Sequence, residues 1–116
     1  MMDIQCTKEL ADYLKRKGKQ HIVVDVATSN ASDFEVSEIF LRMADDANAD
    51  YLIRKKRFRA MPFRITGEDT GQEEKGKEKA GKVLLPPYRL EYDSVVIFDV
   101  KKGWFFWHLT VQGIRL

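Results

Sequence analysis

The pattern of apolar and polar positions near the N-terminus predicts a helix followed by a strand. Thr7 is a candidate N-cap, because a threonine hydroxyl accepts a backbone N–H at the start of a helix. Apolar residues then recur at helical spacing, and a basic turn leads to Gly18, where the helix is expected to end. The run His21–Val26 is rich in β-branched residues and predicts a strand, and Thr28-Ser29-Asn30 predicts a turn after it.

The segment 32–47 carries two competing patterns. Its apolar residues fall at helical spacing, and Ser32 begins a capping box, so the pattern favours a helix. Residues 37–43 also alternate between apolar and polar side chains, as a half-buried strand does. The sequence therefore leaves residues 33–47 undecided between helix and strand, with the helix favoured.

The C-terminal part of the chain predicts a hairpin. Val95–Val100 and Trp104–Val111 are strand-like runs, and Lys101-Lys102-Gly103 is the expected turn between them. The second run is apolar on both faces where it begins, so we expect it at the centre of a sheet or beneath a partner. A short strand is also expected at residues 63–65, after Pro62, which rules out the interior of a helix.

Composition adds the expected domain organisation. Residues 67–82 are dominated by Glu, Lys and Gly, which predicts an exposed charged loop. The chain has 116 residues, 44% of them hydrophobic, so we expect a single domain over residues 1–116 that this loop interrupts. The elements together predict an α+β fold, in which the N-terminal helix packs on a mainly antiparallel sheet with a C-terminal aromatic hairpin.

Charge and cysteine content exclude several classes of protein. The formal net charge of +2 is too small to imply a nucleic-acid or membrane partner by itself. No apolar run approaches the roughly 20 residues that cross a bilayer, and the N-terminus lacks a signal-peptide pattern, so no membrane partner and a cytoplasmic location are expected. One cysteine, Cys6, with the two histidines His21 and His108, is too few for a four-ligand zinc site. No metal and no cofactor are therefore expected.

No catalytic constellation is recognisable in the sequence. Cys6 precedes the first helix, where the dipole would lower a thiol pKa, but no spacing brings a base beside it, and an inert thiol is the favoured interpretation. Asp45, Asp46 and Asp50 lack the spacing of a calcium loop and predict a solvated acidic turn. No phosphate-binding glycine motif occurs. We therefore expect that the chain is not an enzyme and has no catalytic residue.

Basic and aromatic residues concentrate between Tyr51 and Gly67, a stretch without any acid. Guanidinium groups neutralise phosphates and aromatic faces stack on bases, so this combination is typical of a surface for single-stranded nucleic acid. The alternative is that the segment 25–50, which holds seven acids, neutralises the basic stretch. The candidate nucleic-acid contacts are Arg54, Lys55, Lys56, Arg57, Phe58, Arg59 and Arg64.

The run Trp104-Phe105-Phe106-Trp107 has three interpretations. Packing in the core is favoured, an interface comes second because Trp and Phe are frequent interface anchors, and a ligand cage comes last. The candidate interface residues are Trp104, Phe106 and Trp107. The predicted function is a non-catalytic interaction or scaffold domain, a candidate homodimer or binder of a protein partner, and nucleic-acid binding through residues 54–64 is the alternative.

Both ends of the chain match the pattern of a known family. A helix with a basic, glycine-terminated turn at residues 7–18 leads to the strand Ile22–Val26, and the strand Val95–Val100 leads to the aromatic run 104–114. In these segments the chain resembles the HesB-like family, the A-type iron–sulfur carrier fold, and in particular its CC/Se-motif relatives. The resemblance implies that fold and supports a strand at residues 37–43.

The same resemblance implies no iron–sulfur chemistry. The family's cysteines follow the first strand, where this chain has Ala27–Ala31, and its C-terminal cysteine pair is missing at residues 113–116. Iron–sulfur clusters are held chiefly by thiolates, so no site residue is transferred to this chain.

Overall fold

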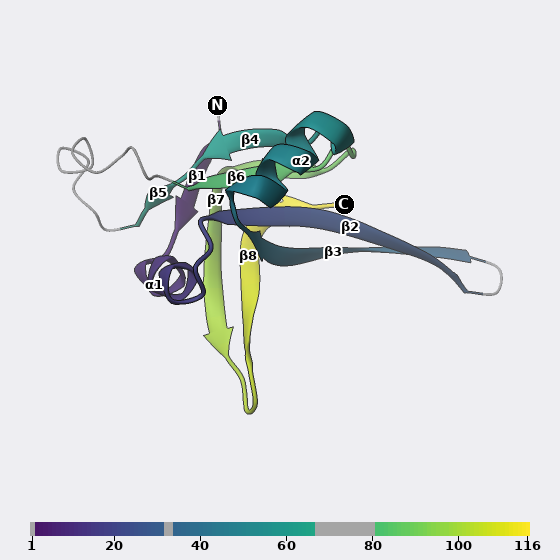
Figure 1. Cartoon of the computed structure of the whole chain (residues 1–116). Helices are drawn as coiled ribbons and strands as arrows, with labels where there is room; N and C mark the ends of the chain where they lie inside the picture. The colour runs from purple at the N-terminus through teal and green to yellow at the C-terminus, as the bar shows by residue number, and fades with distance from the viewer. Residues whose placement is uncertain (1, 32–33, 67–80) are drawn as a thin grey trace.

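The computed structural model describes residues 2–31, 34–66 and 81–116. In these ranges the chain forms two helices and eight strands, and the strands divide into two four-stranded sheets (Figure 1). The predicted α+β class is confirmed. The strands, however, make two sheets that each mix parallel and antiparallel pairs, rather than one mainly antiparallel sheet.

The first sheet has the strand order β5-β1-β7-β8. The strand β1 (Asp3–Cys6) lies between β5 (Arg64–Ile65) and β7 (Glu91–Lys102) and runs parallel to both. The last strand, β8 (Trp107–Arg115), pairs antiparallel with β7 at the edge. The predicted central position is therefore wrong for β8. The other side of β7 pairs with β1, a short strand before the first helix that the sequence did not predict.

The second sheet has the strand order β3-β2-β6-β4. The long strands β2 (His21–Ala31) and β3 (Phe34–Ala44) form an antiparallel hairpin, which extends beyond the rest of the molecule (Figure 1). The strand β6 (Lys82–Leu85) pairs parallel with β2 and antiparallel with β4 (Arg59–Pro62).

Two sequence predictions on the β2–β3 hairpin are wrong. Residues 34–44 are a strand, so the favoured helix in segment 32–47 is not formed and the strand alternative is correct. Thr28-Ser29-Asn30 continue β2 instead of turning, since they pair with β3, and the Thr28 and Ser37 hydroxyl oxygens lie 3.2 Å apart across the two strands. Pairing between the two strands thus decides the secondary structure of both segments. The local sequence pattern carries no information about that pairing.

The first helix confirms its predicted signals. In α1 (Lys8–Arg16), the Leu10 N–H donates to the Thr7 hydroxyl at 3.3 Å, and Gly18 adopts the left-handed φ of 70° that stops the helix. The second helix, α2 (Asp46–Lys56), has Asp45 as its N-cap and ends at Arg57.

Two apolar clusters hold the fold together. The main core lies between the sheets and includes buried side chains of both, together with Leu10 and Leu14 of α1. A smaller cluster fixes α2 on the outer face of the second sheet, where Leu52 and Phe58 pack with Val23 and Leu84. The start of β2, residues 22–24, is therefore covered on both faces.

Other sequence predictions meet the structure only in part. The predicted charged loop 67–82 lies outside the described residues except for Gly81 and Lys82, and Lys82 begins β6. The short strand expected at residues 63–65 corresponds to β5. No helix within the described ranges is long and apolar enough to cross a membrane.

Candidate interaction surface

The β7–β8 hairpin leaves the body of the molecule at Val100 and extends away from it (Figure 1). Val96, Phe98 and Val100 alternate into the core, whereas the next residues of β7, Lys101 and Lys102, are exposed. Alternation places every second residue on the core side, but past Val100 the core no longer reaches the strand.

The turn of this hairpin is longer than the predicted Lys101-Lys102-Gly103. Lys102 still pairs with Trp107, so the turn consists of residues 103–106. The Gly103 N–H closes it by donating to the Phe106 carbonyl at 2.8 Å, and a Cβ at position 103 would lie only 2.9 Å from that oxygen. A side chain at position 103 would therefore crowd the Phe106 carbonyl, and glycine avoids this contact.

The three residues inside the turn form what we call the aromatic tip, Trp104, Phe105 and Phe106. Their exposed fractions are 96%, 93% and 70%. The favoured prediction of core packing is thus wrong for Trp104 and Phe106, because the second strand begins only at Trp107. A contiguous exposed apolar patch on a small protein typically marks an interaction site.

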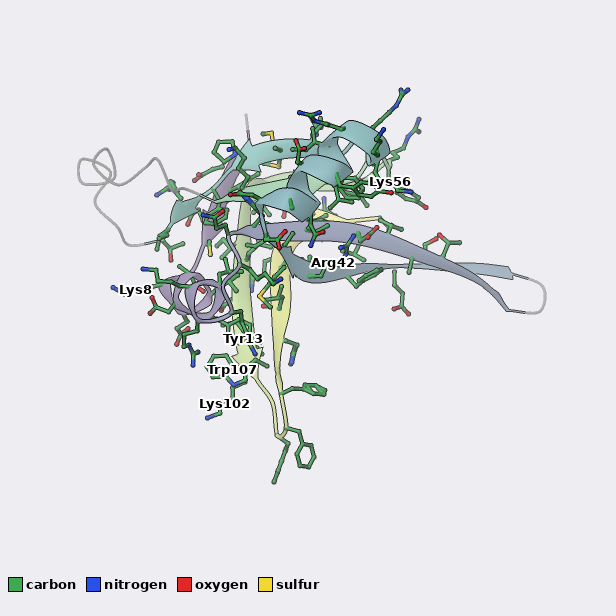
Figure 2. All side chains as sticks on the ribbon, in the orientation of Figure 1. Lys8, Tyr13, Arg42, Lys56, Lys102 and Trp107 are labelled. Carbon is green, nitrogen blue, oxygen red and sulfur yellow. The ribbon has the colours of Figure 1, made fainter. Side chains whose placement is uncertain are left out.

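Trp107, directly behind the tip, is held against α1. Its ring stacks on Tyr13 with centroids 5.1 Å apart and an interplanar angle of 2° (Figure 2). The Arg16 guanidinium lies 4.9 Å from the Trp107 ring centroid, and the Lys102 ammonium lies 5.9 Å from it. Stacking and cation–π contacts therefore fix the hairpin just below the exposed tip.

The start of α1 also bonds to β7. The Thr7 N–H donates to the Phe98 carbonyl at 3.0 Å, and the Thr7 hydroxyl donates to Asp99 at 2.7 Å. Hydrogen bonds, ring stacking and core packing consequently fix the part of the hairpin that carries the aromatic tip.

A groove of about 620 Å³ lies beside this base, between the two sheets. We call it the β3–β8 groove, since most of its lining residues come from those two strands, and Tyr13 of α1 adds to the lining. Its volume is within the roughly 300–1,000 Å³ of small-molecule sites. Ile39, Leu41 and Met43 of β3 face it, with Leu109 and Val111 of β8. Phe40, exposed by 43%, borders the groove, but alternation puts its side chain on the opposite face of β3, the face of Val23 and Ala44. No sequence pattern indicated the groove, because its walls are far apart in the chain.

The predicted nucleic-acid segment is only partly presented to solvent. Lys55, Lys56, Arg57 and Arg59 are exposed, and Arg54, which is also exposed, pairs with Asp50 at 3.1 Å. Phe58 is buried under α2, so its ring offers no face for base stacking.

Two arginines of the same segment have structural positions. Arg57 ends α2 in the left-handed conformation, with φ of 61°. Arg64 lies on β5 in the other sheet and donates to both carboxylate oxygens of Asp3, at 3.1 and 3.0 Å. These hydrogen bonds hold the pKa of Asp3 below its ordinary value. Arg64 therefore lies on a different element from the basic residues at the end of α2.

The candidate nucleophile and the first histidine are both buried. Cys6 is fully buried, and burial, reinforced by the Asp99 charge, raises the pKa of its thiol to about 12. His21 accepts the Lys82 N–H at Nδ1 (3.1 Å) and has Nε2 2.6 Å from Asp46. Since Nδ1 accepts, the ring is neutral and Nε2 donates, so His21 links β2, β6 and α2 and does not form an ion pair with Asp46.

The remaining candidates have ordinary surroundings. Asp45 accepts the Asn48 N–H at 2.9 Å as the N-cap of α2, Asp46 contacts His21, and Asp50 pairs with Arg54. These contacts account for the predicted acidic turn. His108 is exposed on β8 and lines the groove. Within the described ranges, no group of three or more His, Cys, Asp or Glu residues is arranged to hold a metal ion.

Comparison with known proteins adds no relative. No family model, curated protein or solved structure matches this chain.

Proposed function

We propose that this chain is a non-catalytic interaction domain that self-associates through the aromatic tip. The observation that carries the proposal is the almost complete exposure of Trp104 and Phe105 on a turn that the structure holds firmly at its base. Fully burying one such side chain contributes roughly 1.5–3 kcal/mol. Aromatic side chains supply much of the energy of protein interfaces.

Two further observations support an interaction domain over an enzyme. The thiol of Cys6 is buried in the core, with a pKa of about 12, which is unsuited to nucleophilic attack at neutral pH. Both ring nitrogens of His21 are occupied by structural hydrogen bonds, so neither is available to a substrate. The expected kinship with the HesB-like family and the expected cytoplasmic location stay predictions.

Sedimentation velocity over a range of concentrations tests the proposal. The wild type is compared with Trp104→Ser/Phe105→Ser, and Tyr51→Ser is the control because Tyr51 is an exposed aromatic residue on α2. We expect the wild type and the control to associate with the same dissociation constant. The tip variant should associate at least tenfold more weakly. Equal association of all three proteins would refute the proposal.

A second candidate function is binding of single-stranded nucleic acid at the basic end of α2. The observation that favours it is the joint exposure of Lys55, Lys56 and Arg59 with Tyr51, whose ring is 53% exposed. Positive charge at a helix C-terminus also stabilises the helix dipole, which explains part of the cluster without any ligand.

Fluorescence anisotropy with a labelled single-stranded oligonucleotide tests this second candidate. Binding through the basic end of α2 should weaken steeply with salt, because each neutralised phosphate releases a counterion. Arg57→Glu/Arg59→Glu should abolish it, while Lys101→Glu/Lys102→Glu on the distant hairpin should not. Binding that does not respond to salt, or that survives the α2 variant, rules this candidate out.

A further inference from the structure

Among residues 2–31, 34–66 and 81–116, none covers the aromatic tip and none fills the apolar β3–β8 groove. We propose that the β3–β8 groove receives the aromatic tip of a second copy, and that two copies exchange tips about a twofold axis. This inference rests on the proposed self-association and adds the surface that receives the tip. The groove lies beside β8, the strand that begins directly after the tip.

The topology makes such an exchange self-complementary. β8 is the edge strand of its sheet, so its outer side is not paired within that sheet. If two β8 strands cross antiparallel at His108, Trp107 of each copy faces Leu109 of the other, and the tip that precedes Trp107 lies beside residues 110–112 of the other copy. Val111 lines the groove. One twofold operation therefore brings both tips to both grooves, as a closed symmetric dimer requires.

The surface area that could be buried also favours an exchange of two tips over the insertion of one tip into one groove. Trp104, Phe105 and Phe106 expose most of their surface, and an aromatic side chain buries roughly 150–250 Å². Two tips and the two grooves that receive them would bury about 2,000 Å² in total, which is the size of a stable interface. One tip in one groove would bury about half of that, at the weak end of the range.

The sequence charges of the two hairpins are opposite. The segment 21–44 contains four acids and one arginine, Arg42, which lines the groove and pairs with Asp25 at 3.0 Å. Residues 100–116 contain no acid, and Lys101 and Lys102 are exposed just below the tip. The net charges of these two segments therefore attract each other.

Crosslinking between differently labelled copies tests the contact itself. Copies with Phe105→Cys are mixed with copies with Ile39→Cys and treated with a short bismaleimide, and buried Cys6 serves as the unreactive background. The matched control is Met61→Cys on β4, because Ile39 and Met61 are both half-buried against the main core and β4 is the opposite edge strand of the same sheet. We expect the 105–39 product to exceed the 105–61 product at least tenfold. Equal yields, or crosslinking of position 105 only to itself, would overturn the assignment.

Association of a groove variant separates this inference from the proposed function. Ile39→Ser should weaken association at least tenfold, and Met61→Ser should not change it. If Trp104→Ser/Phe105→Ser abolishes association and Ile39→Ser does not, the tip interacts elsewhere and the groove assignment fails alone. If a monomeric wild type binds phosphatidylserine vesicles through the tip, a lipid surface is the partner and both proposals fail.

Discussion

The stacked pair Tyr13–Trp107 gives the sharpest test of how the hairpin is held. The rings lie 5.1 Å apart with an interplanar angle of 2°, inside the geometry in which aromatic pairs contribute about 0.5–1.5 kcal/mol beyond their buried area. Tyr13→Leu and Trp107→Leu each keep an apolar side chain of fair size while removing one ring. We expect a coupling free energy of about 1 kcal/mol between the two changes.

The coupling is measured by a double-mutant cycle of urea unfolding, followed by far-UV circular dichroism. All four proteins carry Trp104→Ser/Phe105→Ser, so that self-association does not contribute to the free energy of unfolding. The control cycle pairs Trp107→Leu with Tyr51→Leu, since Tyr51 lies on α2 and distant changes add within about 0.3–0.5 kcal/mol. A Tyr13–Trp107 coupling no larger than this control would show that the stack does not secure the hairpin.

Three further predictions concern single residues. In the folded protein, Cys6 should react with iodoacetamide at least about a thousandfold more slowly than in urea, because a pKa of about 12 leaves far less thiolate than the usual value of about 8.5; comparable rates would contradict its burial. Arg57→Gly should raise the free energy of unfolding by about 1 kcal/mol, since glycine adopts a φ of 61° without strain, and a loss of stability in urea would contradict this. The lowered pKa of Asp3 stabilises the fold above the ordinary value of 3.8, and this stability is lost as pH falls through the folded pKa. Arg64→Gln should therefore raise the Asp3 pKa in an NMR titration, and an unchanged pKa would refute the role of the Arg64–Asp3 hydrogen bonds.

Elements with local signals could be predicted from the sequence. The cap at Thr7 and the stop at Gly18 depend on neighbouring residues only, and both ends of α1 agree with them. The apolar run of β2 likewise identified a strand from residue 21, although the strand extends further than predicted.

Elements decided by distant partners could not be predicted in the same way. The pattern of residues 32–47 favoured a helix over a strand, yet pairing with β2 makes residues 34–44 a strand. The short strands β1 and β6 each have four residues, too few for a period to show. Both obtain their hydrogen bonds from strands far away in the chain.

The sequence indicated one of the two parts of the candidate site. The aromatic run 104–107 was identified as an interface candidate, but the apolar pattern cannot show that three of its residues lie in a turn beyond the core. The β3–β8 groove combines two sheets, so it exists only in the folded chain. Sequence reasoning therefore identified the aromatic run and missed the groove.

A dilution series of ¹H–¹⁵N NMR spectra asks most directly whether the tip and the groove meet. The chain has two tryptophans, so substituting one of them assigns both indole N–H signals. We predict that the Trp104 indole signal and the backbone amides of residues 39–43 shift together on dilution, with one dissociation constant, while the amides of α2 stay fixed. Spectra that do not depend on concentration, or a tip that shifts while residues 39–43 do not, would contradict the exchange of tips between two copies.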